Sequence, residues 1–157
     1  MWKNRRGFSL IEVIITIALV SVLIGSAVAM FGHIRYADTK KVAEQVNIAL
    51  SDLRLHTMSM SQERKQYLYI YRWSDSYYMK VTYAGKDDVV LNAASAMRLC
   101  GNNVTLYADG EPVEGETIIY VAYKKNGLFA DGITQLITIE GAGTYTIHLD
   151  GVAGRHY

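Results

Sequence analysis

The chain has 157 residues, of which 50% are hydrophobic and 20% charged, so it can bury one ordinary core but not two sizeable ones. Its formal net charge of +1 gives no overall argument for a nucleic-acid partner, and its single proline excludes a proline-rich or collagenous chain. Its one cysteine, Cys100, cannot form an internal disulfide or build a zinc site alone, so packing must stabilise the fold.

Charge and hydropathy are distributed unevenly at the N-terminus. Lys3, Arg5 and Arg6 precede an apolar run over residues 8–31, which a single charge, Glu12, interrupts. At about 1.5 Å per helical residue this run is roughly 36 Å long, enough to cross a hydrocarbon core of about 30 Å. The basic residues before the run predict a single-pass protein of the plasma or inner membrane, with residues 1–7 in the cytoplasm and the chain beyond about residue 33 exported.

Three interpretations compete for this segment. A plain membrane anchor leaves Glu12 unexplained, because a carboxylate inside a bilayer costs about 2.5 to 3.5 kcal/mol on insertion scales. A secretory signal would account for the basic start, and cleavage after Ala29 in the small-residue pattern Ala27-Val28-Ala29 would leave Met30 as the first residue. However, the apolar run is longer than such signals need and carries a carboxylate near its start.

The third interpretation accounts for every residue of the segment. Residues 3–13, KNRRGFSLIEV, followed by the apolar run, resemble the class III leader of type IV pilins and pseudopilins. The resemblance implies that a prepilin peptidase cuts after Gly7 and methylates the new N-terminus at Phe8, so that Glu12 becomes the fifth residue of the mature chain. It also implies three further partners: other pilin subunits, an assembly platform and the lipid bilayer. Glu12 needs a cation in an apolar setting, and cleavage creates one, the ammonium of Phe8, on its own or the next subunit.

A helical pattern continues beyond the membrane segment. Apolar or small residues recur at intervals of three and four from residue 42 to residue 57: Val42, Val46, Ala49, Leu50, Leu53 and Thr57. The pattern predicts one helix over about 8–58 whose second half packs on a soluble domain. We therefore divide the chain into a leader (1–7), a transmembrane and assembly helix (8–31), an amphipathic extension (32–61) and a sheet domain (62–157).

After residue 62 the period becomes alternating, which predicts an antiparallel sheet. The expected strands are 66–73, 77–83, 104–107, 117–123, 135–140 and 145–149, and the segment 89–99 reads equally as a strand or a helical turn. A long N-terminal helix on such a sheet is an α+β, type IV pilin-like fold. The stretches 127–132 and 151–157 are similar to the C-terminal pattern of the GspH/FimT group of minor pseudopilins, which serve type II secretion, type IV pilus and transformation machines.

Catalysis, cofactors and metals are not expected. The chain has no hydrolase, zinc-protease, phosphate-loop or dinucleotide motif. Its four histidines are scattered, and we interpret them as surface or partly satisfied residues rather than ligands: His33, His56, His148 and His156. Four carboxylates crowd residues 109–116, but their spacing does not match an EF-hand, and a solvated hairpin tip is the favoured interpretation: Asp109, Glu111, Glu114 and Glu116.

An aromatic strand face supports a rival function. Four aromatic residues alternate along the first expected strand, Tyr67, Tyr69, Tyr71 and Trp73. We expect these rings to pack beneath the long helix or pair across strands, but such a face can also stack on nucleic-acid bases. Weak candidates for phosphate contact are Lys124, Lys125, Arg155 and His156.

The sequence thus predicts a non-enzymatic minor pilin or pseudopilin of a type IV pilus, type II secretion or competence machine, which ends in a filament at the cell envelope or surface. The alternative is an anchored or secreted module that binds DNA or glycan.

Overall fold

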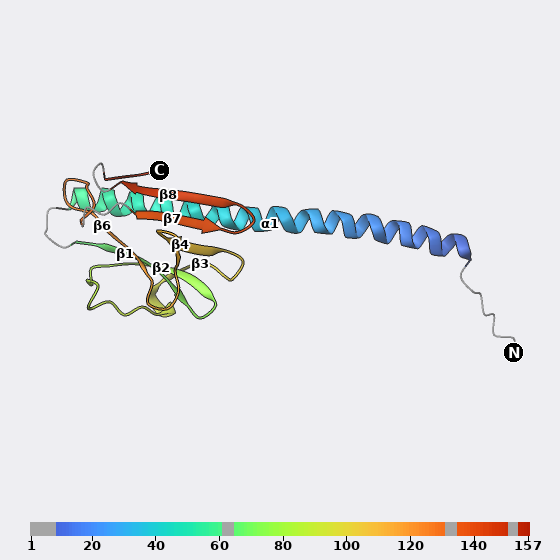
Figure 1. Ribbon diagram of the computed structural model, residues 1–157, viewed down its shortest axis with the longest axis horizontal. Helices are drawn as coiled ribbons and strands as arrows, with labels where there is room; N and C mark the ends of the chain where they lie inside the picture. The colour runs from blue at the N-terminus through green and yellow to red at the C-terminus, as the bar shows by residue number, and fades with distance from the viewer. Residues whose placement is uncertain (1–8, 61–64, 131–134, 151–153) are drawn as a thin grey trace. The chain divides into compact units, whose positions relative to one another are not determined.

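The computed structural model describes residues 9–60, 65–130, 135–150 and 154–157, without the side chains of 26–35 (Figure 1). The leader, with Lys3, Arg5, Arg6, Gly7 and Phe8, lies outside the described residues. The chain divides into two compact units, Met1–Ile34 and Arg35–Tyr157.

One long helix, α1 (Leu10–Ser59), belongs in part to each unit. In the second unit the predicted apolar stripe is confirmed, because Val42, Val46, Leu50 and Leu53 are all buried. Their spacing of three and four residues puts them on one face of the helix, which packs against the strands.

The strands form two antiparallel sheets rather than the one that the alternating pattern suggested. The first sheet has the order β3 (Met97–Cys100), β2 (Ser76–Thr82), β1 (Tyr67–Trp73) and β6 (Ile119–Ala122). The second has the order β5 (Glu111–Pro112), β4 (Thr105–Ala108), β7 (Gln135–Glu140), β8 (Thr144–Asp150) and β9 (Arg155–His156). The sheet to which a strand belongs depends on pairings between distant segments, such as β1 with β6, and alternation alone carries no such information.

All six expected strands are present, with small differences at their ends, and three further short strands accompany them, of which β3 begins in the segment left open as a strand or a helical turn. The segment 89–99 contains both of the structures left open for it. The 3-10 helix η1 (Ala93–Ser95) begins where the Asn92 side chain accepts a hydrogen bond from the Ala94 backbone N–H at 3.2 Å, and β3 follows. The other two, β5 and β9, each span two residues, too short for an alternating pattern to reveal.

The β7–β8 hairpin runs alongside the part of α1 that lies in the second unit (Figure 1). At the hairpin tip, a Cβ on Gly141 would collide with the Thr39 hydroxyl, and one on Gly143 would lie 3.0 Å from the Tyr36 ring. Glycine at these positions therefore allows the hairpin backbone to lie directly on the helix.

The aromatic face of β1 lies on the opposite side from the helix. Leu68 and Ile70 belong to the core that includes α1, so the alternating Tyr69 and Tyr71 point to the other face. The expectation that these rings pack beneath the helix is therefore wrong, whereas the expected pairing across strands is confirmed by ring contacts between Tyr67 and Tyr120 and between Tyr71 and Tyr78.

The loop that follows β2 covers this aromatic face. The Tyr69 hydroxyl donates to the Ala84 carbonyl at 3.0 Å and the Tyr71 hydroxyl donates to the Asn92 carbonyl at 2.7 Å. Both rings are buried, and burial raises the pKa of each hydroxyl. These two rings are consequently closed to a stacking ligand.

Candidate functional site

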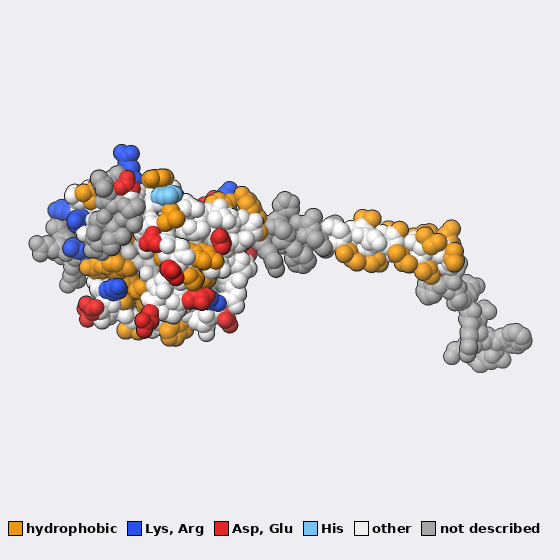
Figure 2. All heavy atoms as spheres, viewed as in Figure 1, with side chains coloured by type: hydrophobic (Ala, Val, Ile, Leu, Met, Phe, Trp, Pro, Cys, Tyr) orange, Lys and Arg blue, Asp and Glu red, His pale blue; other side chains and the backbone are white. Residues whose placement is uncertain are grey.

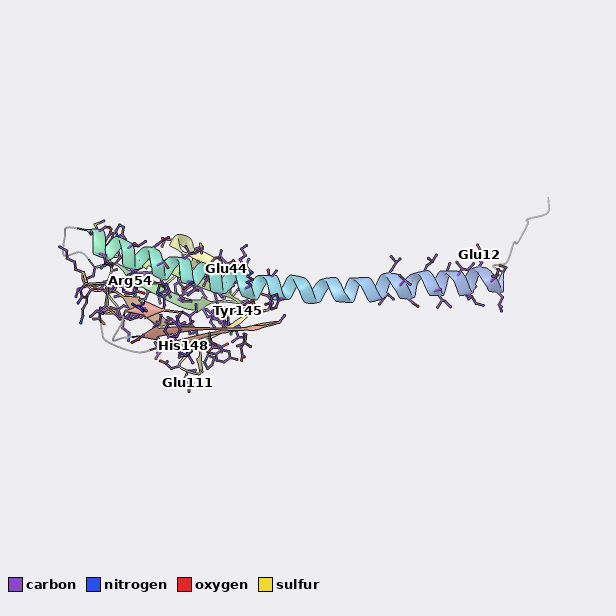
Figure 3. The ribbon with its side chains drawn as sticks, turned by 90° about the horizontal axis from the view of Figure 1, so that it is seen from above. Glu12, Glu44, Arg54, Glu111, Tyr145 and His148 are labelled. Carbon is purple, nitrogen blue, oxygen red and sulfur yellow. The ribbon has the colours of Figure 1, made fainter. Side chains whose placement is uncertain are left out.

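The first turn of α1 carries the residue on which the assembly prediction depends. Ser9 precedes the helix and acts as its N-cap, with its Oγ accepting a hydrogen bond from the Glu12 backbone N–H at 3.3 Å. Glu12 stands three residues after this cap, the spacing of a capping box, and its side chain is exposed (Figure 3). A carboxylate in a first turn also faces the positive end of the helix dipole.

The helix surface around Glu12 is apolar on all sides. Large aliphatic side chains from Leu10 to Ile24 are exposed, between 44% for Val13 and 80% for Leu10. At about 100° per residue these positions encircle the helix, a pattern found in helices that are enclosed by lipid or by other protein. The hydroxyl groups on this surface bond to the helix's own backbone, since Thr16 donates to the Glu12 carbonyl and Ser21 donates to the Ile17 carbonyl. Within the part of the chain that the structure describes, no helix combines the length and the hydropathy of a membrane span.

A second group of polar residues lies where the C-terminal tail meets α1. The His156 ring contacts the Ser51 hydroxyl through Nε2 at 3.1 Å and the Tyr123 hydroxyl through Nδ1 at 3.3 Å. Burial lowers the pKa of His156, and the nearby Arg54 guanidinium lowers it further. Burial also raises the pKa of Tyr123 to about 12, so the phenol remains protonated at neutral pH.

Sequence reasoning did not find this group. It placed His156 in a candidate phosphate contact and gave no role to Ser51 or Tyr123. The pair Ser51 and His156 is 105 residues apart in the chain, so no local spacing could have revealed it.

The contact between Ser51 and His156 has the residue types of a catalytic serine and its general base. In acyl-transfer sites, a carboxylate stabilises the imidazolium that forms when the histidine takes the serine proton. Here the group on the other ring nitrogen is the neutral phenol of Tyr123, and the charge nearby is the cationic Arg54. Both features disfavour an imidazolium, so the geometry argues for a structural hydrogen-bonded group.

The tail also brings together the predicted phosphate-contact residues. Lys124 and Lys125 are exposed on a turn that closes through a 2.7 Å hydrogen bond from the Lys124 N–H to the Leu128 carbonyl. Gly154 packs directly on Gly127 of this turn, which places the exposed Arg155 beside it. Figure 2 shows Lys and Arg side chains gathered at this end of the domain.

Two carboxylates of the acidic loop over residues 109–116 make contacts within the domain. Asp109 Oδ1 accepts the Leu136 backbone N–H at 2.7 Å, and Glu114 forms an ion pair with Arg72. Among the described residues, no cluster of three or more potential ligands could hold a metal ion. Cys100 is half-buried, and burial raises the pKa of its thiol to about 11.

Residues 2–28 match the family model described as the prokaryotic N-terminal methylation motif. The chain therefore carries a methylation motif. The match spans the expected cleavage site and Glu12. With this motif joined to a long helix and an α+β domain, the chain is type IV pilin-like, as the leader predicted.

Among solved structures, two crystal forms of the type IV minor pilin FimU from Pseudomonas aeruginosa are similar to this chain. One is 16% identical, with a TM-score of 0.44 over 75% of this chain and 90% of that one. The other is 15% identical, with a TM-score of 0.47 over 78% of this chain and 88% of that one. No curated protein matches the chain.

Proposed function

We propose that this protein is a non-enzymatic minor pilin or pseudopilin, a structural subunit of a type IV pilus, type II secretion or competence filament. Prepilin peptidase cleaves it between Gly7 and Phe8 and methylates Phe8, and it assembles through its N-terminal helix. The observation that carries the proposal is the methylation motif over residues 2–28, with Glu12 in the first turn of a helix that is apolar all round. The C-terminal pattern of residues 151–157 favours the GspH/FimT group.

The physical basis is that the same helix surface suits both lipid and a helix bundle. The membrane holds the subunit, with its N-terminus in the cytoplasm and its sheet domain exported, until the assembly platform extracts it. Extraction is favourable when the apolar surface from Leu10 to Ile24 is covered again by other helices. Glu12 is then stabilised by the ammonium of a Phe8 residue, which exists only after cleavage.

The first test is the mass of the mature N-terminus, measured on protein isolated from cells with active prepilin peptidase. A chain beginning at methylated Phe8 supports the proposal. A chain beginning at Met30 indicates a secretory signal, and one beginning at Met1 indicates a simple anchor. Either of these results overturns it.

The second test separates assembly from processing with Glu12→Ala. We expect normal membrane insertion and cleavage but incorporation into filaments reduced at least tenfold, because removing one partner of a buried ion pair costs about 3 to 5 kcal/mol. Thr16→Ala, one turn further along the same face, is the matched control, since the Thr16 hydroxyl bonds only to its own helix backbone among the described contacts. Normal incorporation of the Glu12 variant would contradict the mechanism.

A second candidate function, binding of DNA, is supported by the approach of the Lys124–Lys125 turn to Arg155. The case for DNA binding is weakened by the burial of Tyr69 and Tyr71, because a nucleic-acid base cannot stack on these two rings at the centre of the aromatic face. A gel shift at low salt tests it, comparing the wild type with a variant in which Lys124, Lys125 and Arg155 are alanine, and with Lys86→Ala as control. Absence of a shift in the wild type rules this function out.

A further inference from the structure

The C-terminal tail is closely seated on the rest of its domain. Gly154 adopts a φ of +60°, and a Cβ at this position would collide with the Gly127 carbonyl. The Gly154 N–H donates to the Asp150 carbonyl at 2.8 Å, and Tyr157 exchanges two backbone hydrogen bonds with His148, at 2.9 and 3.3 Å. The His148 and Tyr157 rings also stack, with their centroids 5.3 Å apart.

A chain of hydrogen bonds determines which ring nitrogen of His156 carries the proton. The Ser51 hydroxyl donates its single proton to the Asn47 carbonyl at 3.0 Å, so it must accept from His156 Nε2–H. Nδ1 is then the acceptor for the Tyr123 hydroxyl. A neutral imidazole satisfies both contacts, with one donor and one acceptor.

Protonation of His156 disturbs this arrangement. A second N–H at Nδ1 would point at the Tyr123 hydroxyl, which would have to turn its own proton away. The new positive charge would also be half-buried and close to Arg54, whose Nε is buried without a hydrogen-bond partner within the described structure.

Among the described residues, the charge that acts on His156 is the positive one of Arg54, and the group that favours its protonation is the neutral backbone carbonyl of Asn47, whose effect on the pKa is the smallest of the three causes. Arg54 faces His156 from α1, and the protonated phenol of Tyr123 faces it from the end of β6. On β8 the residue paired with it is Leu149, flanked by His148 and Asp150, and the register pairs Asp150 with Arg155.

We propose that the C-terminal tail is an acid-released latch, in which protonation of His156 detaches residues 154–157 from Ser51 and Tyr123. The latch is a property of the folded domain and does not depend on the proposed assembly role. In the closed state, Ser51 and Tyr123 bind the neutral imidazole of His156. In the open state, His156 is exposed and has its ordinary pKa of about 6.5. Closure is therefore favoured above this pH and is lost as the pH falls from about 6.5 toward the lower pKa of the closed state.

Hydrogen exchange of the full chain in detergent tests the latch at about pH 7.5 and about pH 5, on either side of the ordinary histidine pKa of about 6.5. Rates are corrected for the intrinsic effect of pH on exchange. We expect the amides of His148, Gly154 and Tyr157 to lose protection at the lower pH, while amides of the β1–β2 hairpin keep theirs. Retained protection of all three tail amides at the lower pH overturns the proposal.

Two variants and a matched control identify the responsible group. His156→Gln keeps a donor and an acceptor but does not titrate, so its tail should stay protected at both pH values. Arg54→Gln should lose less protection on acidification than the wild type, because a repelling charge is gone. His56→Gln, on α1 and outside the tail contacts, should behave as the wild type does. An equal loss of protection in wild type and His156→Gln overturns the proposal.

A direct titration keeps the test decisive if His156→Gln weakens the tail at both pH values. Histidine NMR of the wild-type chain in the same detergent gives the pKa of each imidazole. A His156 pKa below about 6.5, with release over the same pH range, supports the latch. A His156 pKa at or above about 6.5 overturns it.

Discussion

Ser9 and Glu12 have separable roles at the start of the helix. The Ser9 Oγ accepts a hydrogen bond from the Glu12 backbone N–H. The cap therefore uses the backbone of Glu12 and not its carboxylate. That carboxylate is exposed in the isolated subunit. Ser9 therefore caps the helix while the Glu12 carboxylate stays exposed, as the ion pair of the proposed assembly requires.

Ser9→Ala should weaken the first turn of α1 while leaving the Glu12 carboxylate in place. Loss of a serine N-cap costs about 1 kcal/mol, so the backbone amides of Glu12 and Val13, which bond to Ser9, should exchange faster by about fivefold. Ser21→Ala is the control, because the Ser21 hydroxyl bonds within the helix to the Ile17 carbonyl, 2.8 Å away. Hydrogen exchange of the full chain in detergent measures both, and equal rates in the two variants would show that Ser9 is not the cap.

Gly154 and Gly115 form a matched pair in which only one glycine is crowded. Both have positive φ, +60° and +59°, so alanine should carry a backbone cost of about 1 kcal/mol at either site. A Cβ at Gly115 meets open space, whereas one at Gly154 meets the Gly127–Leu128 backbone.

We expect Gly154→Ala to lower the free energy of unfolding by at least about 2 kcal/mol more than Gly115→Ala. Chemical denaturation of the two variants measures the difference. Equal losses would mean that the tail moves aside without cost.

At the scale of the element, α1 has two different surfaces. From Leu10 to Ile24 the large aliphatic residues are exposed, whereas in the second unit the stripe Val42, Val46, Leu50 and Leu53 is buried against both sheets. The first surface suits lipid or other helices, and the second fixes the sheet domain. In the proposed function, one helix would thus serve assembly through its first surface and folding through its second.

Leu50→Ala and Leu55→Ala test the second surface within a single helix. Leu50 is 0% exposed, so its truncation should cost about 2 to 5 kcal/mol through lost burial and the cavity left behind. Leu55 is 65% exposed, and its truncation should change stability by less than about 1 kcal/mol. Denaturant titration distinguishes them, and a comparable cost for Leu55 would place that residue in an interface absent from the single chain.

At the scale of the whole molecule, the buried core lies within the second unit. Every buried hydrophobic residue among those described falls between Val42 and Leu149. The second unit, Arg35–Tyr157, accordingly contains both sheets and the amphipathic part of α1.

A chain beginning at Arg35 should therefore fold by itself and unfold cooperatively. Circular dichroism with thermal unfolding checks this, with Leu50→Ala in the same shortened chain as the control that should lower the midpoint by several degrees. A non-cooperative transition in the shortened wild type would show that residues before Arg35 contribute to the core.

Local patterns in the sequence determined the N-terminal motif, the long helix and most of the strands. Leader charges, an apolar run with Glu12 and spacings of three and four residues are contained within short segments, so they can be read without the fold. The same is true of the alternation in β1, β2, β7 and β8.

The tertiary structure alone decided how those segments combine. It divided the strands into two sheets, turned Tyr69 and Tyr71 away from the helix and joined His156 to Ser51 and Tyr123. Each of these outcomes depends on contacts between residues far apart in the chain. A local period can show that a strand has two faces, but only packing decides which face meets the helix.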